Sequence, residues 1–239
     1  MKITSIKPSP VFKNYHSLKK DAINFTNSNK SNFDVKYVDI DFFQKFERIF
    51  FDSLMDQKDE LYTFLDSSLI DEVSISEAVS NLFEEDAEYR HLGLFHKTMG
   101  ENVETIKKNG FNPLKIATTK FGPGFYFGAC EESVLIYPGM TLKVGYDGNT
   151  AHGKDLHKYG KLNSKITNLL REKLNLQYSP KRETVFREEA ALSRFVHEYV
   201  RQKIVEELGI DGAFAGNREG YFVVFNPDAV KNIDIYKQI

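Results

Sequence analysis

The stretch that decides the fold reads LGLFHKT over residues 92–98 and FGPGFYFG over residues 121–128. The run Leu92–Phe95 is short and apolar, which predicts a buried β-strand. A strand of this kind delivers the polar residues that follow it to its end, where they can face a cleft. The second stretch has turn chemistry at Gly122–Gly124 and continues as the aromatic segment Phe125–Phe127, which predicts a second short strand.

Further elements are expected on both sides of these strands. A helix between them should carry Val103 and Ile106 on its apolar face and Gly110 at its C-terminal cap. Alternation over Met140–Tyr146 predicts a half-buried strand, and Asp147-Gly148 predicts a turn after it. The other elements expected are helices over 165–174 and about 184–208, with Gly209 as the cap of the second, and strands over 210–214, 221–225 and 233–236.

Composition divides the chain into three parts. Lysines outnumber acids in residues 1–36, and the apolar residues there have no period, which predicts an irregular basic arm. Residues 37–90 are rich in acids and carry apolar residues at helical spacing, with a capping box at Ser74 and Glu77. They are expected to form a small acidic helical subdomain. Residues 91–239 contain the motifs above and are expected to form the main domain, of α+β class.

The bulk numbers exclude several classes of protein. The 239 residues include one cysteine, Cys130, which excludes an internal disulfide framework and a cysteine-based zinc site. The spacing of His152 and His157 does not place both on one helical face, and no metal is expected. The net charge of -2 gives no reason to expect nucleic acid, and no apolar run reaches the roughly 18 residues of a membrane span. The N-terminus has no signal-peptide pattern, so a cytoplasmic location is expected.

In their order and spacing, these motifs resemble those of the ADP-ribosyltransferase superfamily, on the side of the poly(ADP-ribose) polymerases and diphtheria toxin. The resemblance covers roughly residue 92 to the C-terminus. It implies an ADP-ribosyltransferase-like split β-sandwich of two packed sheets, preceded by the small helical subdomain. One departure is that Lys97 stands where the family usually has a glycine. The resemblance is carried by His96-Lys97-Thr98, the helix that ends in Gly110-Phe111, the strand at Tyr126, the second tyrosine Tyr137, and YFVVFNPDAV from Tyr221.

The resemblance implies that NAD is the co-substrate. His96 is then expected to bond the adenosine-side ribose with support from Thr98, and the backbone of Lys97 to bond the nicotinamide amide. Tyr126 and Tyr137 are expected to sandwich the nicotinamide ring, a role that needs the aromatic ring and not its hydroxyl. The expected NAD-binding set is completed by Gly124, Ser133 and Tyr221.

The third element of the family pattern is altered. Registering the late strand on the family places Tyr221 where a catalytic glutamate often stands. Glu219 lies two residues earlier and shares a face with Tyr221 in an extended strand, and Gly220 could host a bulge that re-aims it. Catalysis is therefore expected to depend on Glu219 together with His96 and Tyr126. Whether Glu219 or Tyr221 fills the third position stays open.

These implications predict a mono-ADP-ribosyltransferase that cleaves nicotinamide from NAD and transfers ADP-ribose to a macromolecule, with protein favoured over nucleic acid as the acceptor. A toxin or effector delivered by a specialised secretion route is an alternative to a housekeeping role. Two rival functions stay open: a catalytically weak module that binds NAD or ADP-ribose, and an NAD glycohydrolase. His96 and Tyr126 each have an ordinary structural explanation on their own, so the prediction depends on the set of motifs.

Overall fold

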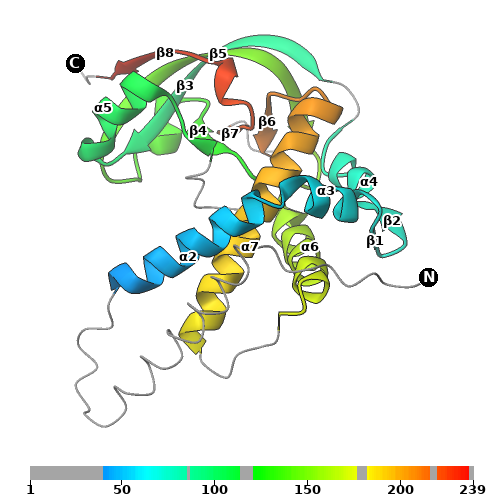
Figure 1. Cartoon of the computed structure of the whole chain (residues 1–239). Coiled ribbons are helices and arrows are strands. Elements are labelled where there is room, and N and C mark those ends of the chain that lie inside the picture. Colours follow the sequence, from blue (N-terminus) through cyan, green and yellow to red (C-terminus); the bar gives the residue numbers. More distant parts are fainter. Residues whose placement is uncertain (1–39, 85–86, 114–120, 177–181, 216–219, 237–239) are drawn as a thin grey trace. The chain divides into compact units, whose positions relative to one another are not determined.

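The computed structural model describes residues 40–84, 87–113, 121–176, 182–215 and 220–236, with side chains described from residue 44 and, in the fourth range, from residue 187. It has a mixed α/β architecture (Figure 1). The predicted basic arm over residues 1–36 lies outside the described residues.

The chain divides into two compact units whose boundaries differ from the predicted ones. The described residues up to Leu65 join Thr167–Phe195 in the first unit, and Asp66–Ile166 joins Val196–Ile239 in the second. Residues 66–90, expected in the acidic subdomain, therefore belong with the sheet. The reason is a pairing between residues distant in sequence: Phe83 forms a β-bridge with Gly153, at the end of the long sheet strand.

The first unit contains α2 (Ile40–Met55), most of α3 (Lys58–Asp66) and parts of α6 and α7. Phe46, Phe50 and Leu54 recur at helical spacing along α2 and are buried, so the predicted apolar stripe is confirmed. Glu47, next to this stripe, accepts ion-paired hydrogen bonds from Arg187 (3.0 Å) and Arg194 (3.3 Å) of α7. The charge pairs thus flank the apolar packing within this unit.

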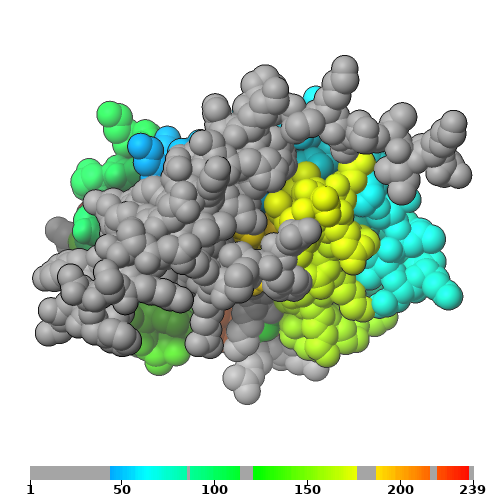
Figure 2. Space-filling view, turned by 60° about the horizontal axis from the view of Figure 1, so that its bottom comes forward, coloured from blue at the N-terminus to red at the C-terminus, as the bar shows by residue number. Residues whose placement is uncertain are grey.

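The second unit begins with a two-residue hairpin, β1 (Leu69–Ile70) and β2 (Val73–Ser74), followed by α4 (Ile75–Ser80). The hydroxyl of Ser74 accepts a hydrogen bond from the Glu77 N–H at 3.1 Å, so the Ser74 half of the predicted capping box is confirmed at this N-terminus. Asp71, in the turn of the hairpin, forms an ion pair with Lys165 of α6. Figure 2 shows the same neighbourhood, with the β1–β2 segment (cyan) beside α6 (yellow-green).

Apart from the β1–β2 hairpin, the described strands of the second unit form one six-stranded sheet in the order β3-β4-β7-β6-β5-β8. The additional pairing of β3 with β5 closes the first five of these strands into a ring. β3 pairs with β5 over its whole length, and β8 extends the other edge of β5. The buried core of this barrel-like sheet includes Leu94, Phe127, Val144 and Phe222. The strands are β3 (Glu88–Thr98), β4 (Phe125–Gly128), β5 (Met140–Gly153), β6 (Gly212–Ala215), β7 (Tyr221–Val224) and β8 (Val230–Ile235).

The two motif-bearing strands are confirmed, whereas the predicted turn at Asp147-Gly148 is wrong. Asp147 and Gly148 stand opposite His91 and Arg90 of β3, and β5 continues to Gly153. A partner strand long enough to pair with these residues overrides their local turn preference. Long-range pairing of this kind has no local sequence signal.

The helices of the second unit follow the predicted caps closely. α5 (Gly100–Asn109) buries Val103 and ends at Gly110, which has a φ of 71°. The helix predicted over 165–174 begins earlier, as α6 (Tyr159–Lys173). The long helix is α7 (Arg182–Gln202), followed by a π-helical turn over Lys203–Glu207 and Gly209 at a φ of 65°. Left-handed backbone at these two glycines costs little because they lack a Cβ.

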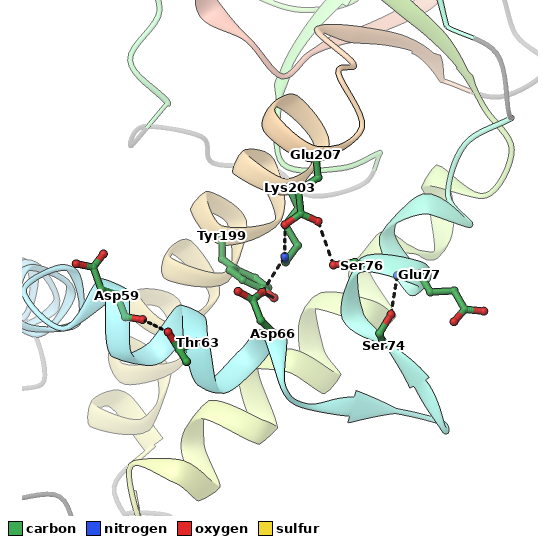
Figure 3. A network of polar contacts seen from close by, with 9 residues as sticks. All are labelled: Asp59, Thr63, Asp66, Ser74, Ser76, Glu77, Tyr199, Lys203 and Glu207. Carbon is green, nitrogen blue, oxygen red and sulfur yellow. Dashed lines mark hydrogen bonds and ion pairs between the residues drawn. The ribbon is translucent and has the colours of Figure 1, made fainter.

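A polar network fastens the π-helical turn to the start of the second unit (Figure 3). Lys203 is only 6% exposed, and its ammonium group lies 2.7 Å from an Asp66 oxygen and 2.5 Å from a Glu207 oxygen. Tyr199 donates a hydrogen bond to Asp66 (2.8 Å), and Ser76 donates one to Glu207 (3.1 Å). Burial alone would lower the pKa of Lys203, but the hydrogen bonds and charges of Asp66 and Glu207 raise it above its ordinary value.

Replacing Lys203 by alanine should therefore lower the free energy of unfolding by about 1–3 kcal/mol, because two facing carboxylates lose their shared cation. The matched control is Lys165→Ala, which removes the exposed pair with Asp71 and should cost no more than about 1 kcal/mol. Urea unfolding of the two variants beside the wild type measures both values. Equal losses for the two variants would show that the buried network has no special weight.

Candidate functional site

His96 lies near the C-terminal end of β3 and is partly buried. Its Nδ1 donates a hydrogen bond to the carbonyl oxygen of Tyr126 at 2.9 Å, which ties β3 to β4. The imidazole ring packs against Phe111 and Phe127, with ring centroids 5.1 and 5.2 Å away. Burial lowers the pKa of His96, against the opposing effect of the bond to Tyr126. At neutral pH the ring is uncharged, and with Nδ1 protonated its Nε2 is a hydrogen-bond acceptor.

Tyr126 has a structural duty that the sequence did not predict. Its hydroxyl accepts a hydrogen bond from the N–H of Phe121 and donates one to the carbonyl of Gly122, both at 2.9 Å. The side chain thus braces the turn that precedes its own strand. That stacking on nicotinamide needs only the ring of Tyr126 stays a prediction, and in the free protein the hydroxyl has a separate duty, since it holds two backbone groups.

A row of aromatic side chains connects Tyr126 to Tyr137. The ring of Phe121 lies 6.2 Å from that of Tyr126 and also 6.2 Å from that of Tyr221, with which it is inclined by only 30°. Burial and a hydrogen bond to Tyr221 raise the pKa of Tyr137. Phe121 thus links Tyr126 to Tyr221, and Tyr137 is close enough to Tyr221 for that residue to affect its pKa. Phe121 opened the quoted motif but was not predicted as a site residue, because nothing local distinguishes its ring from a core side chain.

Gly124 serves the packing of the sheet. A Cβ at this position would lie 2.5 Å from Val223 Cγ1 and 2.6 Å from the carbonyl oxygen of Val224, both in β7. Only glycine fits so close to a neighbouring strand. The expected approach of this backbone to a dinucleotide remains a prediction, and the glycine itself is explained by the contact with β7.

Ser133 lies in the 3₁₀ helix Glu131–Val134, between the two tyrosine positions in sequence. Its Oγ is 3.0 Å from Cys130 Sγ and 3.0 Å from the place that a Cβ on Gly220 would occupy. Ser133 is therefore beside the start of β7, next to the strand residue Tyr221. The structure brings these two predicted residues into the same neighbourhood.

Lys97 and Thr98 form the end of β3. The ammonium group of Lys97 donates to the carbonyl of Gly139 at 3.0 Å, and strand alternation puts its side chain on the face opposite that of His96. Gly139 packs so close to the Thr98 carbonyl that a Cβ would lie 2.3 Å from this oxygen. The lysine is thus accommodated at this strand end, with its side chain directed at the segment after Tyr137.

Glu219, the predicted catalytic carboxylate, lies outside the described residues. Tyr221 begins β7 and stands opposite Gly128 of β4, partly buried. Sequence reasoning did not consider two carboxylates near Tyr137. Glu131 accepts a hydrogen bond from the Tyr236 hydroxyl at 2.8 Å, and Glu132 is exposed. The pKa of Glu132 is lowered by hydrogen bonds from its own backbone N–H and from Cys130.

No protein-family model, curated protein or solved structure matches this chain. Among the described residues, no three His, Cys, Asp or Glu side chains lie close enough together to hold a metal ion. Within the same residues, no helix combines the length and the apolar character needed to cross a membrane. Function is therefore argued from the geometry of the site itself.

Protonation of His96 should destabilise the fold, because its pKa is lower in the folded chain than in the unfolded one. The sign follows from linkage: the unfolded chain takes up the proton first as the pH falls, so stability drops below about pH 6.5. His96→Asn can keep the bond to the Tyr126 carbonyl but does not titrate. The variant should thus lose less unfolding free energy than the wild type between about pH 7.5 and pH 5.5. Identical pH dependence in urea unfolding would contradict this account.

Tyr126→Phe should destabilise the protein by about 1–2 kcal/mol, because the N–H of Phe121 and the carbonyl of Gly122 lose their shared partner. Tyr236→Phe is the matched control, since it removes one hydroxyl that makes a single part-buried hydrogen bond, to Glu131. Thermal unfolding of both variants gives the comparison. A loss in Tyr126→Phe no larger than in the control would mean that the turn does not depend on the hydroxyl.

Proposed function

We propose that the protein is an NAD-dependent mono-ADP-ribosyltransferase whose second unit is a variant of the ADP-ribosyltransferase split β-sandwich. One observation carries the proposal: contacts run from His96 through Tyr126 and Phe121 to Tyr221, and Tyr221 lies close enough to Tyr137 to help raise its pKa. Four of these five residues were predicted from separate sequence motifs, and they come from three strands and the segment after a 3₁₀ helix. A ligand bound by all of these residues would explain why separate motifs lie together in the fold.

The chemistry proposed for this site begins with a neutral histidine. In that state His96 can accept a hydrogen bond from a ribose hydroxyl through Nε2. The rings of Tyr221 and Tyr137 offer aromatic faces to the nicotinamide, and offset stacking contributes about 0.5–1.5 kcal/mol beyond burial. The polar strand end thus suits the sugar, and the aromatic row suits the base.

In the proposed reaction, the bond between the nicotinamide nitrogen and ribose C1′ breaks, and its electron pair leaves with nicotinamide. The ribose passes through an oxocarbenium-like state, and the acceptor nucleophile then forms a bond to C1′ and loses its proton. A carboxylate at Glu219 would stabilise the positive charge and accept a hydrogen bond from a ribose hydroxyl. Tyr221 can supply a hydrogen bond but no charge at neutral pH, since the reference pKa of tyrosine is about 10.

Purified full-length protein incubated with NAD labelled in the adenylate part tests the proposal. Nicotinamide release is followed by chromatography, and label is scored on protein and on nucleic acid of an added cell lysate. Release together with labelled macromolecules supports the transferase. Release without label points to the glycohydrolase, and NAD binding in calorimetry without release points to the binding module. Absence of binding at millimolar NAD by the folded protein removes all three.

Glu219→Gln should slow nicotinamide release by on the order of 10²–10³ while NAD affinity changes little, because the variant removes a charge but keeps the shape. Tyr221→Phe should act mainly on affinity, since it removes a hydroxyl that can bond the ribose but keeps the ring stacked on Phe121. Steady-state rates and calorimetry on the two variants separate these effects. If Glu219→Gln left the rate unchanged and Tyr221→Phe lowered it strongly, Tyr221 and not Glu219 would be the residue on which turnover depends.

A further inference from the structure

The exposed apolar side chains of the second unit gather at one end of the candidate site. Of the large apolar side chains that are exposed in the described part of the chain, all but Leu69 and Tyr89 belong to residues 99 and 135–140. They are Met99, Leu135, Ile136 and Met140, called the apolar rim below, together with Tyr137 of the site. Ile136 is the most exposed of them at 76%.

The two segments of the rim meet at the end of β3. Gly139 packs on the Thr98 carbonyl, and Met140 stands opposite Thr98 in the ladder of β3 and β5. The sulfur of Met140 lies 3.6 Å from the place that a Cβ on Gly100 would occupy. The rim is therefore a local cluster built on Tyr137 and the strand end that carries His96, and not a scatter of single exposed residues, which would need no explanation.

The charges beside the rim favour a protein over a polyanion. Glu101 follows Met99 in the first turn of α5, and Glu132 lies one turn before Leu135. Both are exposed, and hydrogen bonds hold the pKa of Glu132 below its ordinary value. The cation nearest in sequence, Lys97, has its ammonium group on the Gly139 carbonyl. Phosphates would meet carboxylates here, whereas nucleic-acid sites are strongly basic.

We propose that the apolar rim docks the acceptor: a protein segment that places an apolar side chain against Ile136 and presents its nucleophile to the site at Tyr137. This inference rests on the proposed function and names the acceptor class for that reaction. Exposed apolar patches beside a site mark protein interaction surfaces. Apolar burial at the rim holds the acceptor, and the acidic neighbours at Glu101 and Glu132 disfavour nucleic acid.

The test compares Ile136→Ser with Leu69→Ser in the full-length chain. Leu69 is 61% exposed in β1, so its replacement removes another well-exposed apolar side chain, away from the rim. For each protein, label transferred from NAD to lysate protein is divided by nicotinamide released without lysate. This ratio should fall about tenfold or more in Ile136→Ser and stay at the wild-type value in Leu69→Ser. Met99→Ser is the second rim variant, used in place of Ile136→Ser if circular dichroism shows that variant to be unfolded.

Each remaining outcome decides against the proposal. Equal ratios in rim and control variants would remove the rim as the docking surface. Label on the nucleic acid of the lysate would show that the acceptor is not a protein. Label on the chain itself would show that the rim binds a second copy of this chain. Failure of the proposed function is recognised separately, because the wild type would then either release no nicotinamide with or without lysate, or release it without labelling any macromolecule.

Discussion

The antiparallel pairing of β3 with β5 is the constraint on which the sheet and the candidate site depend. It runs without interruption from Glu88 opposite Thr150 to Thr98 opposite Met140. Side chains alternate along a strand, so a slip of one residue would move Leu94 and His96 together to the opposite face of the sheet. Burial of Leu94, at 1% exposure, opposes that slip by roughly 1.5–3 kcal/mol. Core packing therefore sets the face on which His96 meets Tyr126.

The turn before β4 shows a second constraint, in which structure and proposed chemistry share the same atoms. The backbone at Gly124 approaches β7 too closely for any side chain, and the hydroxyl of Tyr126 then holds the turn that leads into it. Phe121, at the first position of that turn, is thereby positioned against Tyr221. The aromatic row is a consequence of how tightly the two strands pack. A ligand that stacked on Tyr221 would meet a surface already ordered in the free protein, so little conformational entropy would be lost on binding.

Local signals predicted the elements whose causes are local. The caps at Ser74, Gly110 and Gly209 are where their residue types predicted them, because Ser74 caps a helix with its own hydroxyl and the two glycines end one with left-handed backbone. The turn at Asp147-Gly148 failed since the length of β3 overrode it, and the boundary near residue 90 failed because a bridge from Phe83 to Gly153 is invisible to composition. In the site, His96 could be predicted from its place at a strand end. The bracing hydroxyl of Tyr126 and the part played by Phe121 could not, since both depend on contacts made only after folding.

The motif residues consequently differ in how strongly they support an NAD site. Gly124 would be required with or without a ligand, because β7 excludes a Cβ there. The hydroxyl of Tyr126 is likewise accounted for by the turn it holds. The side chain of Tyr137 is about half exposed, and packing of the sheet gives no comparable reason for it. His96 does tie β3 to β4, but the same bond through Nδ1 leaves Nε2 as an acceptor at the end of β3. His96, Tyr137 and Tyr221 are therefore the residues that support a ligand site, and residues 121–128 contribute the scaffold that brings them together.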